Sequence, residues 1–211
     1  MTESGFVRSA GRALVAGGMM TIIVNAVITP FLPGHVSFAE TAASTPFLWR
    51  QSAAALAAVL LLFGSVGVYL AHDRKRGPFA AIAFALAFVG SALLLATEWT
   101  QLFDIRDFAM RAPDVMEKLD AAKGVSWPDV GAIIAFGTFV AGWIALCAST
   151  IRSTALARGA AVTVIVGFFA TPLLQSALPS PWGPALGNTL LGSGWIWLGL
   201  SMTSSTLRGK G

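Results

Sequence analysis

The sequence predicts an all-α, polytopic membrane protein in which six transmembrane helices form one bundle of three consecutive hairpins. Three observations lead to this fold class. Of the 211 residues, 55% are hydrophobic and only 11% are charged, whereas soluble domains carry about 25% charged residues. The chain also contains six apolar runs of the roughly 17–25 residues needed to cross a bilayer. Its basic residues form short clusters between these runs, as loops that orient a membrane protein do.

The six expected spans belong to a single domain, residues 1–211. They cover residues 12–33, 47–71, 78–99, 129–150, 157–177 and 185–203, with an outer loop at 100–128. The two arginines before the first run, together with "SFA" at 37–39, would also suit a cleaved signal peptide. The first run is longer than the roughly 7–15 residues of a signal core, so we expect it to remain as a span.

The distribution of Lys and Arg predicts which side of the membrane each connection faces. Nine of them lie in one set of connections and five in the other, four of these in the long outer loop. The first set holds Arg8, Arg12, Arg74, Lys75, Arg76, Arg152, Arg158, Arg208 and Lys210. Because short basic clusters stay in the cytoplasm, we expect both termini there, in the inner membrane of a bacterium. The same clustering argues against nucleic acid as the partner of this chain, whose net charge is +4.

The first and fifth spans each carry a narrow face of small and hydroxyl side chains. The two stripes are Ala13, Gly17, Thr21, Asn25, Thr29 and Gly159, Thr163, Gly167, Thr171, Gln175. Small residues allow membrane helices to approach closely, so the stripes predict helix packing, with a cavity at their polar outer ends as the sharper alternative. Both spans also contain a Thr-Pro pair, at Pro30 and Pro172, where we expect the helix to kink or end.

The outer loop is expected to continue the third helix and then to lie along the membrane boundary as an amphipathic segment. The stretch 98–113 keeps an apolar flank beside its charges, and "DVMEKLDAAKG" at 114–124 predicts a short helix that ends at Gly124. Val115, Met116, Leu119 and Ala122 share one face of this short helix. Ser126, Pro128 and Asp129 then have the spacing of a helix start for the fourth span.

Polar side chains inside the spans gather in the outer half of the predicted bundle. An ionisable residue within the membrane is by default a hypothesis for a functional site, and Glu98 and Arg50 occur at similar depth as plausible partners. The alternative is that each side chain only reaches the lipid headgroups beside Trp49 and Trp99. The candidate ligand-binding residues for a shallow, outward-opening pocket are Asn25, Arg50, Glu98, Gln175 and Asn188.

We expect no catalytic set, no metal site and no cofactor. The single cysteine, Cys147, provides neither a disulfide nor a metal cluster. His35 and His72 belong to opposite sides of the membrane, which excludes haem held between them. "GSG" at 192–194 resembles the nucleophile site of intramembrane serine proteases, but neither histidine lies at that depth to serve as its base.

Three segments give the chain a resemblance to a scattered group of proteins. They are "PFLWRQSAAALAAVLLLFGSVGVYL", "GSALLLATEWTQLFDIRDFAMRAP" and "LGSGWIWLGLSM". The chain resembles uncharacterised bacterial multi-pass integral membrane proteins of unknown function. The resemblance implies a membrane bundle and carries no activity over to these residues.

Three functions remain open from the sequence. The first is a non-enzymatic accessory or structural subunit of a membrane complex, or a lipid-interacting scaffold, with membrane lipids or other membrane-protein subunits as partners. The second is a small transporter or binder of lipids and amphiphiles that uses the outward-facing polar pocket. The third is a lipid-active enzyme at the outer face, with Glu98, Asp104 or Asp107 as acid or base.

Overall fold

The computed structural model describes residues 3–72, 77–122, 124–153 and 156–208. Within these residues the chain is helical, with connecting loops and no strand. Five helical segments of this part are long and apolar enough to cross a membrane: Ser4–Phe31, Thr45–Leu70, Pro78–Arg111, Trp127–Arg152 and Arg158–Ala177. The predicted all-helical class is therefore confirmed, and five of the expected spans correspond to helices of sufficient length and apolar character. The sixth, residues 185–203, lies within the long helix α9 (Trp182–Arg208), which is not among these five.

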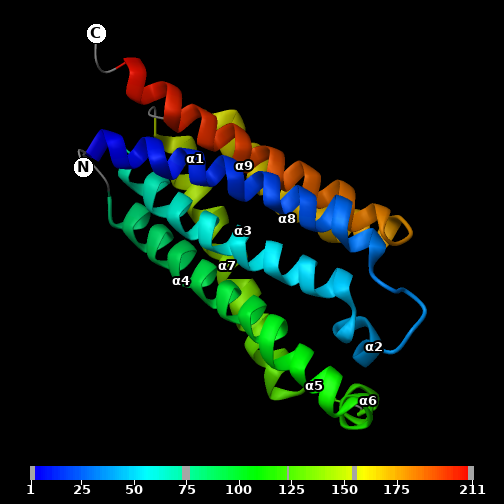
Figure 1. Ribbon diagram of the computed structural model, residues 1–211. Helices are drawn as coiled ribbons and strands as arrows, with labels where there is room; N and C mark the ends of the chain where they lie inside the picture. The colour runs from blue at the N-terminus through cyan, green and yellow to red at the C-terminus, as the bar shows by residue number, and fades with distance from the viewer. Residues whose placement is uncertain (1–2, 73–76, 123, 154–155, 209–211) are drawn as a thin grey trace.

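Figure 1 shows long helices packed side by side, with three short helices at one end. The long helices are α1 (Glu3–Ile22), α3 (Thr45–Leu70), α4 (Pro78–Thr100), α7 (Trp127–Arg152), α8 (Arg158–Ala177) and α9. Each contacts the next along this series, and α9 returns to pack against α1. The start of α1 and the end of α9 lie at the same end of the molecule, opposite α2, α5 and α6.

Glycines set the closest approaches between these helices. A Cβ at Gly18 of α1 would lie 2.5 Å from the carbonyl oxygen of Gly192 of α9, and one at Gly199 would lie 2.5 Å from that of Gly11. A Cβ at Gly142 of α7 would likewise lie 2.3 Å from the backbone nitrogen of Ala87 of α4. At these points the backbones are in direct contact, as small residues permit in membrane helices.

Each of the two predicted stripes divides in two, because its small residues pack against a neighbouring helix and its polar end lines a cavity described below. On α8 this polar end consists of Thr171 and Gln175. On α8, a Cβ at Gly167 would lie 2.7 Å from Leu191 of α9, and Thr171 meets Gly187 of α9 equally closely. On α1, Gly17 packs against α3, whereas the polar outer end of the stripe lines a cavity described below. The contact of α1 with α9 uses Gly11 and Gly18, which lie outside the predicted stripe.

The two Thr-Pro pairs have different outcomes. Before Pro30, α1 widens into the π-helical turn η1 (Ile23–Ile28), tightens into the 3-10 turn η2 (Thr29–Phe31) and ends. In α8 the helix continues through Pro172 to Ala177. Around Pro172, α8 is in close contact with α9, since Gly183 and Gly187 of α9 pack against its backbone on both sides of the proline.

The segment between α4 and α7, which the sequence predicts as the outer loop, forms a small helical cap together with α2 around an apolar cluster. The helix α4 continues through the π-turn η3 (Gln101–Ile105) into α5 (Arg106–Arg111), as expected, and α6 (Pro113–Ala121) follows. With α2 (Phe38–Ala43) they bury Ala39, Ala42, Phe47, Ala109 and Met116. Of the predicted apolar face of α6, Met116 is buried, and Val115 and Leu119 are exposed.

Local signals at the helix starts explain two further features. Ser126 and Asp129 form the capping box that begins α7, as the sequence predicts. Ser37 and Glu40 form another capping box that begins α2, so the segment considered as a cleavage site is a helix start.

Arg106 binds the carbonyl oxygens at the other end of α2. Its Nη1 donates to the carbonyl oxygens of Ala42, Ala43 and Ser44 at 3.2, 2.9 and 2.7 Å.

Candidate functional site

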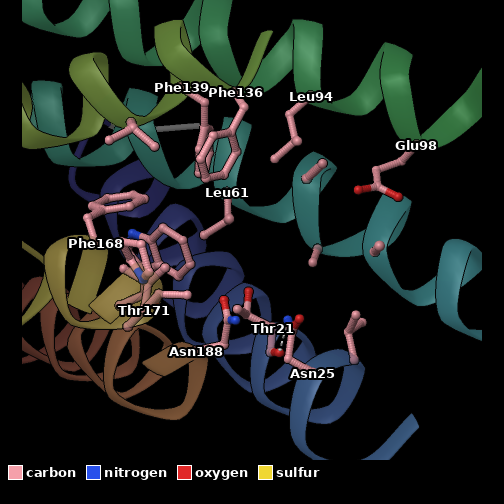
Figure 2. Close-up of a pocket in the computed structure, with 18 of the residues that line it drawn as sticks. Thr21, Asn25, Leu61, Leu94, Glu98, Phe136, Phe139, Phe168, Thr171 and Asn188 are labelled. Atoms are coloured by element: carbon pink, nitrogen blue, oxygen red, sulfur yellow. Dashed lines mark hydrogen bonds between the residues drawn. The ribbon is translucent and has the colours of Figure 1, made fainter. Parts of the chain in front are cut away.

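A cavity of about 540 Å³ lies among the long helices, in the half of the molecule nearest the helical cap (Figure 2). Each of the long helices, or the turn that extends it, contributes at least one residue to its wall. Its size is within the range of about 300–1,000 Å³ that is usual for pockets that bind small molecules.

All of the candidate ligand-binding residues line this one cavity. They are Asn25 of η1, Arg50 of α3, Glu98 of α4, Gln175 of α8 and Asn188 of α9. In Figure 2, Glu98 faces the space from one wall, and Asn25 and Asn188 lie on the other. Arg50 and Glu98 therefore do not lie on separate, lipid-facing sides of the molecule. Whether the cavity binds a ligand stays a prediction.

Each of the two asparagines donates one hydrogen bond within its own helix. Asn25 Nδ2 donates to the carbonyl oxygen of Thr21 at 2.9 Å, and Asn188 Nδ2 donates to that of Pro184 at 2.9 Å. The hydroxyls of Thr21 and Thr171 bond in the same way to carbonyls one turn back. Such bonds satisfy polar groups where water is scarce. The side-chain oxygens of both asparagines accept no hydrogen bond from the described residues, so they can accept one from a ligand in the cavity.

Arg50 donates hydrogen bonds to two neutral partners, one on η2 and one on its own helix α3. Its Nε donates to Thr29 Oγ1 of η2 at 3.3 Å, and its Nη1 donates to Gln51 Oε1. Gln51 Nε2 donates in turn to Gln101 Oε1 of η3. Gln51 is fully buried, so this chain of hydrogen bonds fixes the orientation of the guanidinium from the protein interior. Gln51 and Gln101 are absent from the predicted site, although Gln51 directly follows Arg50 and Gln101 lies three residues after Glu98.

Glu98 presents a carboxylate without a hydrogen-bond partner in the described part of the chain. Its Oε2 is buried and makes no hydrogen bond. Arg50, the partner expected for Glu98, lines the same cavity, but neither a hydrogen bond nor an ion pair joins the two side chains within the described ranges. An unpaired charge in an apolar environment is costly, so Glu98 is the group in this cavity that a ligand would stabilise most.

The deep end of the cavity is aromatic. Phe139, Phe168 and Trp195 line it and meet in edge-to-face contacts, with ring centroids 5.8–6.1 Å apart. Trp143 extends the cluster behind them, 5.5 Å from Trp195. The Nε1–H of Trp195 is buried and finds no acceptor in the described residues, whereas that of Trp143 donates to Ser91 Oγ at 3.2 Å. The cavity is therefore polar at its rim and apolar at its base.

A second, apolar groove of about 780 Å³ runs along the outside of the molecule between η1 and α3. Val27, Phe31, Trp49 and Leu56 are among its walls. Trp49 of this groove directly precedes Arg50 of the cavity, so the two hollows lie on adjacent faces of α3.

The other residues considered from the sequence lie outside the cavity. Asp104 is exposed on η3, and Asp107 pairs with Arg111 at 2.7 Å on α5. Ser193 is exposed and donates to the carbonyl oxygen of Thr189 in its own helix at 2.7 Å. Among the described residues, no three His, Cys, Asp or Glu side chains are grouped so that they could hold a metal ion.

Comparison with known proteins finds no match to the chain among family models, curated proteins or solved structures. The resemblance to bacterial multi-pass proteins therefore stays a prediction, and the function must be argued from the cavity itself.

Proposed function

We propose that this chain is a six-span protein of the bacterial cytoplasmic membrane that binds an amphiphile in the central cavity, from the non-cytoplasmic side. Binding of this kind would serve either retention or transport of the ligand. The observation that carries the proposal is the convergence of Asn25, Arg50, Glu98, Gln175 and Asn188, from separate helices, on one cavity.

The position of α9 supports a sixth crossing. It is 27 residues long and holds no charged residue between Trp182 and Ser204. Its Gly199 lies against Gly11 and its Gly192 against Gly18, so α9 runs antiparallel to α1 at the same depth. Ser193 and Thr189 bond to carbonyls of α9 itself, which lowers the cost of their hydroxyls in lipid.

The orientation follows from the basic residues, as in the sequence argument. The start of α1 carries Arg8 and Arg12, and the end of α9 beside it carries Arg208. Arg152 ends α7 and Arg158 begins α8. These basic helix ends favour the cytoplasm for that end of the molecule. The cavity and the helical cap then belong to the outer half of the membrane.

The polarity of the cavity supports an amphiphile as the ligand. Its polar rim would face the head group of a lipid in the outer leaflet, and its aromatic base would face the acyl chain, which lies deeper in the membrane. The apolar groove beside Trp49 gives a hydrocarbon chain a surface next to the wall that carries Arg50. Polar and ionisable residues are expensive within a membrane, and a bound head group would offset that cost.

The test is to fill the cavity and measure the lipid that stays bound. Ala54 lines the cavity on α3, and Ala85 of α4 is exposed and lies outside both hollows. We expect Ala54→Phe to lose the lipid that co-purifies with the wild type in mild detergent, measured by native mass spectrometry, and Ala85→Phe to keep it. Equal retention by both variants, each folded as judged by its melting curve, would show that the cavity does not hold the lipid.

An accessory role in a larger complex is the second candidate. It is favoured by the exposed apolar side chains of the helical cap, which are Phe103, Phe108, Met110, Val115 and Leu119. Exposed apolar patches mark contacts with proteins or membranes. Under this alternative, a stable partner would co-purify with the wild type in mild detergent and would be lost on replacing Phe108 and Leu119 by serine. Purification as a lone monomer would count against it.

A further inference from the structure

We infer that the cavity recognises a zwitterionic head group, with an acidic group bound by Arg50 and a primary ammonium bound by Glu98. This inference rests on the proposed function and names the ligand class of the same site. The chemistry is that of an aminophospholipid head, in which a phosphate and an NH₃⁺ group are joined by a short linker.

Arg50 retains the capacity to bind an anion. Its Nε and Nη1 donate to Thr29 and Gln51, and Nη2 makes no hydrogen bond to the described residues. Both of its partners are neutral, so its positive charge is oriented without being paired. A planar guanidinium with free N–H groups matches the oxygens of a phosphate or carboxylate.

Glu98 offers the complementary acceptor. Its buried Oε2 has no hydrogen-bond partner among the described residues, and the side chain faces the same space as Asn25 and Asn188. The free side-chain oxygens of the two asparagines add neutral acceptors across the cavity. An ammonium group has three N–H donors and no acceptor. The carboxylate of Glu98 and the amide oxygens of the asparagines could together accept these three hydrogen bonds.

The pairing of one cation with one anion discriminates between head groups. A purely anionic head would satisfy Arg50 and leave Glu98 unpaired. A quaternary ammonium has no N–H with which to bond to Glu98 Oε2. Only a head group that carries both an acidic group and N–H donors on its cation satisfies both side chains.

The wild-type protein tests the inference without any substitution. In delipidated protein, we expect dioleoyl phosphatidylethanolamine to bind roughly tenfold to a hundredfold more tightly than dioleoyl phosphatidylcholine or phosphatidylglycerol, the contribution of one charge-assisted hydrogen bond. Native mass spectrometry with matched acyl chains gives these affinities. Binding of all three lipids with equal affinity would overturn the head-group inference and leave the proposed function standing. Failure to bind any of them would overturn both.

Two substitutions test which side chain binds the ammonium group and which binds the phosphate. Glu98→Gln should abolish the preference for phosphatidylethanolamine over phosphatidylcholine and should leave phosphatidylglycerol binding unchanged or stronger. Arg50→Gln should weaken all three lipids, because the phosphate contact is common to them. Asp107→Asn is the matched control, since it removes a carboxylate from an exposed ion pair on α5 and should leave the preference intact. A preference that survives Glu98→Gln would contradict the assignment of the ammonium group.

The soluble head alone distinguishes a lipid from a small zwitterion as the source of this chemistry. We expect glycerophosphoethanolamine to compete for the cavity far more weakly than the lipid, because it lacks the chain that the aromatic base and apolar groove would cover. Competition at the same concentration as the lipid would contradict a lipid source while supporting the head-group chemistry.

Discussion

Two buried tryptophans of the aromatic cluster differ in a single hydrogen bond. Trp143 and Trp195 are both almost completely buried and lie in edge-to-face contact. The Nε1–H of Trp143 donates to Ser91 Oγ, and that of Trp195 has no acceptor in the described residues. A buried donor without a partner carries a desolvation cost, whereas a satisfied one contributes to stability.

This difference predicts unequal effects of the same substitution. Trp143→Phe should lower the free energy of unfolding by about 1 kcal/mol more than Trp195→Phe, the net value of one hydrogen bond. The loss of ring area is the same in both variants, so it cancels in the comparison. Thermal or denaturant unfolding of ligand-free protein in one detergent measures the two losses. Equal losses would show that the indole of Trp195 also has a partner in solution.

At the scale of helices, backbone contact between α1 and α9 makes their interface intolerant of any side chain. A Cβ at Gly192 would lie 2.6 Å from the carbonyl oxygen of Gly18, and neither backbone can yield without separating the helices. At Gly137 of α7, by contrast, no atom lies within 4 Å of an added Cβ.

The two glycines form a matched pair for a stability experiment. Gly192→Ala should destabilise the protein by about 1–3 kcal/mol, as overpacking in a core does. Gly137→Ala should be neutral or stabilise it by up to about 1 kcal/mol, because alanine is the better helix former. Melting temperatures in the same detergent compare the variants. If Gly192→Ala is as stable as Gly137→Ala, then α1 and α9 are not in backbone contact.

The helical cap depends on one arginine that holds the end of a short helix. Arg106 donates to three carbonyl oxygens at the end of α2 and Ser44, where a helix leaves its last carbonyls without partners. A helix of this length has little stability of its own.

Loss of this contact should therefore loosen α2 locally. Arg106→Gln should reduce the protection of the α2 amides by about 1.5–3 kcal/mol, the value of a hydrogen bond to a charged group, as measured by hydrogen exchange. Arg111→Gln is the control on the same helix. It removes only an exposed ion pair with Asp107, and such pairs contribute about 0–1 kcal/mol. Unchanged protection in Arg106→Gln would mean that α2 is held by apolar packing alone.

For the whole molecule, the decisive question is whether α9 crosses the membrane beside α1. Ser180 precedes α9, and Ser204 lies in its last part; both are exposed, as is Ser9 near the start of α1. In the proposed six-span arrangement with cytoplasmic termini, Ser9 and Ser204 would face the cytoplasm and Ser180 would face outward.

Cysteine labelling tests this arrangement in intact cells. In a Cys147→Ala background, which removes the buried native thiol, a membrane-impermeant maleimide should label Ser180→Cys. It should label Ser9→Cys and Ser204→Cys only after permeabilisation. Labelling of Ser204→Cys from outside would exclude the sixth span and, with it, a cavity closed by α9 within the membrane.

The predicted site could be found from the sequence because its residues are rare in their setting. Arg50 and Glu98 interrupt long apolar runs, so their functional interest is visible without a structure. Gln51 and Gln101 were not recognised because their importance comes from a hydrogen bond between segments 50 residues apart. The lack of an acceptor for Trp195 Nε1–H among the described residues is likewise invisible in a sequence, since it depends on what surrounds the indole.

The sequence by itself determined the features that depend on neighbouring residues. These are five long apolar helices, the capping box before α7, the continuation of α4 into α5, and the polar residues that interrupt the apolar helices. Only the tertiary structure decided which helix faces meet. In lipid, a helix is apolar on both its packed and its exposed sides, so hydrophobic periodicity does not mark the buried face. Backbone contacts such as that of Gly18 with Gly192 set how the helices are rotated. That rotation brings five scattered polar side chains to one cavity.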